Sequence, residues 1–200
     1  MTGTAKDNHI AAAQSLLTQM SARSHVAPKR LVDPGPTDGE LELIFKAAES
    51  APDHGRIRPW RFIIVSVEKR VALGNAFVEA LLRRDPSADQ DQIAAAHDKA
   101  LRAPCLLLAV VSEAPSDPPV PRSECLLSLG CGIQNMLLMA QTLVIGSGIT
   151  SGQAMNDAAI RSLFGLQAHE EGICFLNFGT VLSSKPARPR PAYGSFVSTL

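Results

Sequence analysis

The sequence predicts a single domain of the α/β or α+β class, because helical and strand-like segments alternate along the chain. Its 200 residues suit one domain with a short additional arm. Apolar residues make up 46% of the chain and charged residues 19%, which allows a hydrophobic core without disulfides or metals. Two runs of strand character, residues 60–67 and 104–112, lie between segments whose apolar residues recur at helical spacing.

The first third of the chain holds two predicted helices, a loop and a strand. Apolar residues predict a helix over residues 10–22, after which prolines interrupt the chain. Thr37 and Glu40 match a capping box, in which each side chain accepts a hydrogen bond from the other residue's backbone, so we expect a second helix there. Residues 51–59 form a loop fixed by two prolines and a glycine, and residues 60–67 follow as a strand.

The remaining elements follow from the same interpretation of apolar spacing and turn residues. They are helices over 68–84 and 87–102, a strand over 104–112, a proline-rich connector over 113–121, a long helix over about 122–144, a short strand near Ile149, a helix over about 153–164 and a strand over 172–181. The run over 104–112 is continuously apolar, which indicates a strand buried on both faces.

Residues 126–149 are long enough and apolar enough to be considered as a membrane span. The segment also contains Gln134, Asn135 and Gln141, and one of its flanks lacks basic residues. We therefore predict a central helix, packed by its own chain and by a second subunit.

Charge and cysteine content argue against several function classes. Nineteen basic residues balance nineteen acidic residues, so no net field attracts the chain to nucleic acid or to an anionic membrane. The four cysteines lack C-x-x-C spacing, and we expect buried reduced thiols rather than a disulfide framework or a zinc site. No glycine-rich motif of Rossmann or P-loop type is present. Residues 1–9 lack the apolar core of a signal peptide, which predicts a cytoplasmic protein.

Basic residues gather in three clusters beside predicted core elements. They are Arg23-Ser24-His25 with Lys29 and Arg30, the loop Asp53-His54-Gly55-Arg56-Ile57-Arg58, and Lys185, Arg188 and Arg190. In a chain without net charge, such clusters suit an anionic small molecule such as a phosphate. The alternative for each cluster is an ordinary solvated surface. Residues 146–152 (GSGITSG) add backbone N–H groups and hydroxyls suited to a planar polar ring, or else form only a tight turn.

Four segments follow one another in a characteristic order: residues 23–31 (RSHVAPKRL), 51–62 (APDHGRIRPWRF), 131–152 and 174–180 (CFLNFGT). Their order resembles that of the FMN-dependent nitroreductase family, and the resemblance extends over about residues 10–190. It implies an α+β fold, a mixed central sheet flanked by helices, assembled as an intertwined homodimer with FMN at the subunit interface. Together with the polar N-terminus and the weakly apolar tail, it implies a disordered segment at 1–9, an FMN-binding domain at 10–182 and an arm at 183–200 that crosses to the partner.

The resemblance also implies which residues contact the phosphate end of FMN. Arg23, Lys185 and Arg188 would hold the phosphate. Ser24 and His25 would lie beside the ribityl phosphate, with His25 standing where the family usually has serine.

At the ring end, the resemblance implies two contact segments. They are Pro52, Asp53 and His54 from the partner subunit, and Thr150, Ser151 and Gly152 near N5 and O4. The negative charge of reduced flavin also calls for a donor near N1 and O2, for which Arg58 and Lys29 are the candidates. No catalytic side chain and no metal ligand is expected from the protein, because the flavin carries the chemistry.

The implied activity is a two-step reaction of the ping-pong type. NAD(P)H passes a hydride to the flavin and leaves, and a nitro-aromatic, quinone-like or other electron-poor acceptor then takes its place. Three alternatives stay open: a protein that stores or fragments flavin without nicotinamide turnover, a flavin-free dimeric interaction module, and a small thiol redox protein. The cysteine spacing disfavours the last of these.

Overall fold

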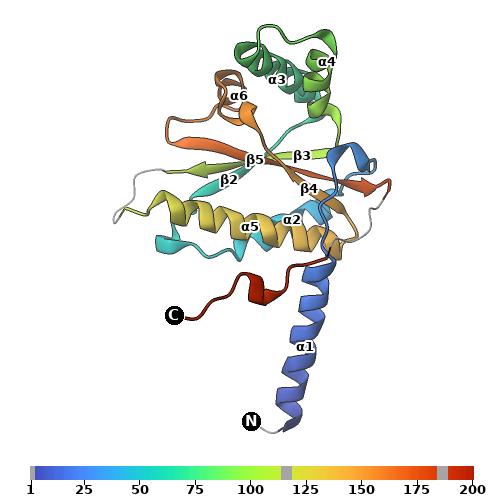
Figure 1. The fold of residues 1–200 in the computed structure, drawn as a ribbon, viewed down its shortest axis with the longest axis vertical. Coiled ribbons are helices and arrows are strands. Elements are labelled where there is room, and N and C mark those ends of the chain that lie inside the picture. Colours follow the sequence, from blue (N-terminus) through green and yellow to red (C-terminus); the bar gives the residue numbers. More distant parts are fainter. Residues whose placement is uncertain (1–2, 114–118, 184–188) are drawn as a thin grey trace.

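The computed structural model of the protein describes residues 3–113, 119–183 and 189–200. Within these residues, a five-stranded sheet lies between two layers of helices (Figure 1). One layer contains α2 (Asp38–Glu49) and α5 (Arg122–Thr142). The other contains α3 (Arg70–Arg84), α4 (Gln90–Asp98) and α6 (Ala158–Leu163). The α+β class and the helices on both faces of the sheet are therefore confirmed.

The strands are β1 (Leu31–Val32), β2 (Trp60–Ile64), β3 (Cys105–Ser112), β4 (Gly146–Thr150) and β5 (Glu170–Val181). Their order is β1-β5-β3-β2, and β4 also pairs with β5. Each pairing between the described strands is antiparallel. The prediction of a mixed sheet is wrong for this chain, because β3 and β5 run in opposite directions and every other strand pairs antiparallel with one of them.

Strand β3 sends alternate side chains into two separate hydrophobic cores. Leu107, Ala109 and Val111 pack with residues of α2 and α5. Leu106, Leu108 and Val110 pack on the opposite face with residues of α3 and α6. This alternation follows from the two-residue period of a strand. It confirms that the continuous apolar run over 104–112 is buried on both faces.

Several predicted helices have other boundaries in the structure: α3 begins at Arg70 and not at 68, and α4 covers only Gln90–Asp98 of the predicted 87–102. The helix predicted over 153–164 is divided into the 3-10 helix η5 (Gln153–Asn156) and α6, because Asp157 caps α6 by accepting a hydrogen bond of 2.8 Å from the backbone N–H of Ala159. The long helix α5 begins at Arg122 as predicted and ends at Thr142. Among the described residues, no helix has both the length and the hydropathy that crossing a membrane requires.

Helix α1 (Gly3–Ala22) projects away from the layered body (Figure 1). It begins seven residues before the predicted start at Ile10, so the expectation of a disordered segment at 1–9 is wrong for residues 3–9, which are helical. The apolar side chains of Ile10, Leu16, Leu17 and Met20 are between 42% and 62% exposed. Near the end of the helix, the backbone carbonyl of Gln19 accepts a hydrogen bond of 2.8 Å from the amide of Gln141 in α5.

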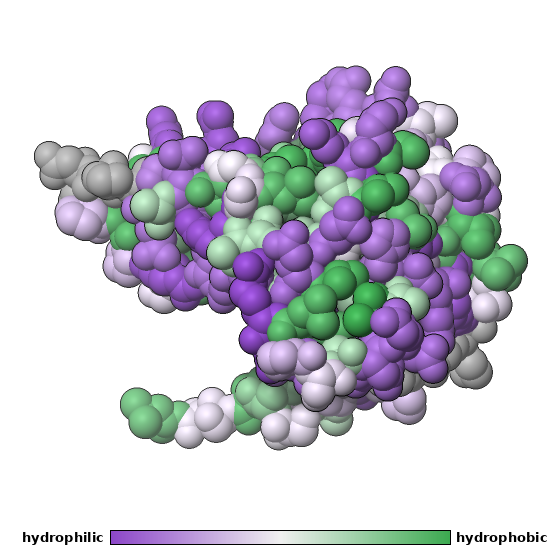
Figure 2. Space-filling model, turned by 90° about the horizontal axis from the view of Figure 1, so that it is seen from above, coloured by the Kyte–Doolittle hydropathy of each residue, from purple (hydrophilic) through white to green (hydrophobic). Residues whose placement is uncertain are grey.

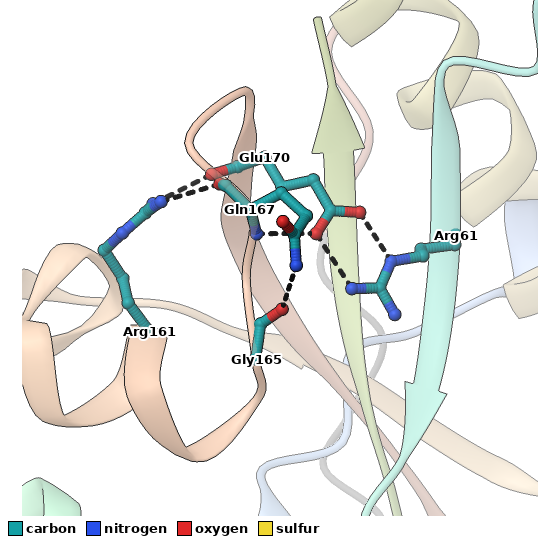
Figure 3. Close-up of polar contacts among 5 residues, drawn as sticks. All are labelled: Arg61, Arg161, Gly165, Gln167 and Glu170. Carbon is teal, nitrogen blue, oxygen red and sulfur yellow. Dashed lines mark hydrogen bonds and ion pairs between the residues drawn. The ribbon is translucent and has the colours of Figure 1, made fainter. Parts of the chain in front are cut away.

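The turn between α6 and β5 is fixed by the buried carboxylate of Glu170 (Figure 3). This carboxylate reaches across β3 and accepts hydrogen bonds of 2.6 and 2.9 Å from Arg61 of β2. It also accepts a bond of 3.0 Å from the backbone N–H of Gln167, while Arg161 donates to the carbonyls of Gln167 and Glu170 at 2.8 Å each. The hydrogen bonds from Arg61 lower the pKa of the Glu170 carboxyl. The network ties the start of β5 and the end of α6 to the sheet.

Candidate functional site

A cavity of about 500 Å³ opens on the side of the sheet that carries α3, α4 and α6. Its walls include Thr150, Ser151 and Gly152, the segment that the resemblance places along the flavin ring. The volume falls in the range of about 300–1,000 Å³ that is typical of small-molecule sites. Figure 2 looks onto this side of the molecule, where hydrophilic side chains surround smaller hydrophobic patches. The predicted ring-binding segment therefore lines a cavity of suitable size.

The buried side chain of Asn177 in β5 fixes the end of β4 that leads into this segment. Asn177 is 2% exposed, and its amide donates hydrogen bonds of 3.2 Å to the carbonyl of Gly148 and 3.1 Å to the hydroxyl of Thr150. It also lines the cavity. The sequence prediction did not include Asn177 among the site residues, although it lies in the quoted motif CFLNFGT. Only the pairing of β4 with β5 shows its role.

His25 and Val26 lie against the edge of β4. The backbone N–H of Val26 donates a hydrogen bond of 2.9 Å to the carbonyl of Ser147. A Cβ atom on Gly148 would lie 2.2 Å from the carbonyl oxygen of Val26 and 3.0 Å from the ring of His25. Glycine is therefore required at position 148, because any side chain would push these residues away from the strand.

Arg23, His25 and Arg190 form a basic cluster at this edge. Arg190 donates hydrogen bonds to the carbonyls of Ser21, at 3.1 Å, and Arg23. Burial and then the charge of Arg190 lower the pKa of Arg23, and burial and then the charge of Arg23 lower the pKa of His25. No carboxylate among the described residues forms an ion pair with any of the three. The cluster is therefore a surface of unbalanced positive charge that suits an anion.

The basic cluster and the cavity are neighbours along β4. His25 lies against Gly148, and Thr150 lines the cavity two residues further along the strand. Residues two apart in a strand share a face and are separated by about 7 Å. Pro28, three residues after His25, also lines the cavity. One molecule with an anionic end and a planar ring can therefore contact both places.

The loop over residues 51–59 is held by its own polar contacts. One carboxylate oxygen of Asp53 accepts a hydrogen bond of 2.9 Å from the backbone N–H of Arg58. Its other oxygen is buried without a hydrogen-bond partner among the described residues. His54 pairs with Glu124 at the start of α5. Arg56 and Arg58 adopt positive φ values of 54° and 47°, which are uncommon outside glycine and indicate a constrained loop.

The predicted ring contacts lie on two different sides of one chain. Pro52 borders a separate, open hollow beside α5, together with Leu127 and Cys131. The segment of Thr150 to Gly152 lines the cavity on the opposite face of the sheet. The structure therefore does not bring the 51–59 loop and the 150–152 segment together within one chain.

The remaining predicted residues are placed as follows. Ser24 is exposed beside the basic cluster, and Lys29 is exposed next to the cavity-lining Pro28. Lys185 and Arg188 lie outside the residues that the structure describes. Arg190, which shared their sequence cluster but was not among the predicted phosphate contacts, is the tail cation that the structure brings to Arg23.

The chain is similar in sequence to known proteins of one family. Residues 22–180 match the profile of the nitroreductase family. A Haemophilus influenzae protein named "Putative NAD(P)H nitroreductase" is 32% identical over 164 residues, which are 82% of this chain and 87% of that protein. "Putative NAD(P)H nitroreductase YdjA" from Escherichia coli is 30% identical over 151 residues, 76% of this chain and 81% of that protein.

Solved structures show the same fold. A nitroreductase-like family protein from Bacillus cereus superposes with a TM-score of 0.76 at 18% identity, covering 92% of this chain and 95% of that one. The FMN and NADPH-dependent nitroreductase NfnB from sphigopyxis sp. strain HMH gives a TM-score of 0.70 at 18% identity, covering 91% and 97%. With the family profile and the sequence relatives, this confirms the resemblance: the chain belongs to the nitroreductase family and is an oxidoreductase.

Proposed function

We propose that this protein binds FMN and uses NAD(P)H to reduce nitro-aromatic, quinone-like or other electron-poor acceptors. One observation carries the proposal: a basic cluster, without a carboxylate partner among the described residues, stands beside a cavity whose wall includes the 150–152 segment. The names of its relatives, NAD(P)H nitroreductases and an FMN and NADPH-dependent nitroreductase, support the choice of cofactor and electron donor.

The chemistry of the described residues fits the two ends of FMN. Guanidinium groups are matched to phosphate oxygens in both charge and geometry, so Arg23 and Arg190 suit the phosphate. The repulsion between Arg23 and Arg190 is relieved when an anion lies between them. His25 then donates from a ring nitrogen, in the place of the usual serine. Lys185 and Arg188 are proposed to add to this site from the tail.

At the ring end, the chain supplies position and polarity. Bound flavin supplies hydride and electron transfer, and the protein needs no acid or nucleophile of its own. The hydroxyls and backbone N–H groups of Thr150, Ser151 and Gly152 orient the ring edge, and Asn177 holds that segment in place. Lys29 of the same chain, or Arg58 from the partner subunit, stabilises negative charge at N1 and O2.

A homodimer completes this site in the proposal. Pro52, Asp53 and His54 of the partner subunit approach the ring, because the same residues of one chain lie on the far side of its sheet. Exposed apolar surface on α1 and on α5, where Leu127 is 66% exposed, supports association with a second copy. The tail at 183–200, with exposed Phe196 and Val197, is proposed as the arm that crosses to the partner.

The absorption spectrum of the purified protein, followed by anaerobic addition of NADPH, tests the proposal. We expect flavin bands that bleach when NADPH is added and return when a nitro-aromatic or quinone acceptor follows. Flavin that stays oxidised would favour a storage or fragmentation role. A protein that stays colourless after FMN is supplied would favour the interaction module.

A further inference from the structure

One wall of the cavity carries three cations that the flavin site does not use. Arg84 ends α3, Lys99 begins the 3-10 helix η4 (Lys99–Leu101), and Arg102 follows it directly. All three line the cavity together with the 150–152 segment. No acidic residue is found among the described residues of the lining. This wall therefore contributes three positive charges to a cavity whose described lining supplies no opposite charge.

These three cations differ from several other arginines of the chain, which pair with carboxylates. Arg83, next in sequence to Arg84, pairs with Asp157 at 2.7 Å and with Glu79 at 3.3 Å. Arg61 and Arg122 also pair with carboxylates. Arg84, Lys99 and Arg102 form neither an ion pair nor a side-chain hydrogen bond with any residue in the described parts of the chain. Their donors are therefore free for a ligand.

Hydrogen bonds from a buried arginine fix the segment that carries Lys99 and Arg102. Arg70 of α3 is buried, and its guanidinium donates hydrogen bonds of 2.8 Å to the carbonyl of Ala100 and 3.0 Å to the carbonyl of Pro104. A third bond of 3.2 Å reaches the carbonyl of Val65 at the end of β2. Ala100 itself is fully buried. The backbone at the two cations is thus fixed before any ligand binds, which lowers the entropy lost on binding.

We propose that Arg84, Lys99 and Arg102 form a subsite for an anionic group, phosphate or carboxylate, of the ligand that shares the cavity with the flavin. The inference rests on the proposed function, in which the FMN phosphate occupies the cluster at Arg23. A cleft lined by one sign of charge attracts ligands of the opposite sign, and arginine and lysine bind both phosphate and carboxylate. The anionic group belongs either to the nicotinamide dinucleotide or to the acceptor.

Equilibrium binding to the oxidised protein tests the subsite with two matched ligand pairs. NADP⁺ differs from NAD⁺ by one phosphate, and 4-nitrobenzoate differs from 4-nitrobenzamide by its negative charge. We expect the wild type to prefer at least one anionic member, and the triple variant Arg84→Gln, Lys99→Gln, Arg102→Gln to bind that member at least about tenfold more weakly. The neutral or less charged partner should change by less than about twofold. Lys46→Gln in α2 is the control, because it removes one exposed charge on the other side of the sheet.

The outcomes separate the possible sources of the anion. Loss confined to NADP⁺ assigns the subsite to the dinucleotide, and loss confined to 4-nitrobenzoate assigns it to the acceptor. Two further measurements test the subsite without the triple variant. The single variants Lys99→Gln and Arg102→Gln should each weaken binding of the anionic ligand, and high salt should weaken its binding to the wild type. The inference is overturned if the wild type shows no charge preference, if the variants keep it, or if both members of a pair weaken equally. The subsite test measures binding to the oxidised protein and involves no turnover. Failure of the proposed function would therefore appear in a different measurement, as flavin that NADPH does not bleach.

Discussion

Arg190 in the tail donates a hydrogen bond to the backbone carbonyl of Arg23, and the charge of Arg190 lowers the pKa of the Arg23 guanidinium. Their charges repel each other, and neither is paired with a carboxylate within the described residues. Such an arrangement is unfavourable by itself and becomes favourable when an anion is shared between the two.

The ionisation of His25 should report whether the cluster holds an anion. In the FMN-free protein, burial and the charge of Arg23 lower the His25 pKa from 6.5, so its neutral form is favoured in the folded state. Below pH 6.5 the unfolded chain therefore binds a proton at His25 more readily than the folded chain does. The contribution of His25 to the free energy of unfolding is highest above pH 6.5 and decreases as the pH falls from 6.5 toward the lowered pKa. Bound phosphate should raise the pKa. An NMR pH titration of the imidazole protons of His25, with and without FMN, measures the two pKa values, and the two titration curves should be well separated. Identical curves would place the phosphate elsewhere.

Replacing Gly148 by alanine should displace the residues of the basic cluster that lie against β4. The added Cβ would lie 2.2 Å from the carbonyl oxygen of Val26 and 3.0 Å from the ring of His25, so these two residues must move away from β4. We expect a loss of about 1–3 kcal/mol in the free energy of unfolding, as for other overpacked sites, together with weaker FMN binding. Gly39→Ala is the control, because nothing lies within 4 Å of a Cβ at that position. Urea unfolding and FMN titration measure both effects. Unchanged FMN affinity in the Gly148→Ala variant would show that FMN binding does not depend on the contact between β4 and the basic cluster.

The capping box at the start of α2 should stabilise the fold without affecting the site. The hydroxyl of Thr37 accepts a hydrogen bond of 3.3 Å from the backbone N–H of Glu40. Thr37→Ala should therefore cost about 1 kcal/mol in urea unfolding and leave FMN binding unchanged. Thr142→Ala should have a smaller effect, since that hydroxyl donates to the carbonyl of Leu138, which lies in its own helix. Equal losses in the two variants would contradict the role of the cap.

The cysteines should behave as packing residues and not as redox partners. All four are free, and Cys125 and Cys174 are buried. Burial raises the pKa of Cys105 and of Cys174 to about 11, and burial also raises the pKa of Cys125. Because the thiolate is the reactive form, a thiol reagent at pH 8 should label these three only after unfolding. Rapid labelling of Cys105 or Cys174 in the native protein would revive the thiol redox alternative.

Features set by nearby residues were predictable from the sequence. Thr37 and Glu40 are three residues apart, and the cap forms as expected. The strand over 104–112 needed only its own apolar run to predict burial on both faces. The start of α1 could not be predicted in this way, because residues 3–9 are polar and lack the apolar spacing that marks a helix.

Features set by distant pairing were not predictable in the same way. The antiparallel sheet depends on which strands lie beside β5, and no local pattern specifies that choice. The roles of Asn177 and Arg190 depend on contacts with residues 27 and 167 positions away in the sequence, respectively. A single sequence could place the basic clusters in order, but it could not show that one tail arginine reaches Arg23.

The affinity of the Arg23→Ala protein for FMN, compared with riboflavin, tests the phosphate cluster most directly. Riboflavin carries the same ring without the phosphate, so it serves as the internal control, and Lys46→Ala controls for the loss of one charge. We predict that Arg23→Ala weakens FMN binding by at least about tenfold and changes riboflavin binding by less than about twofold. FMN bound as tightly by the variant as by the wild type would contradict the account.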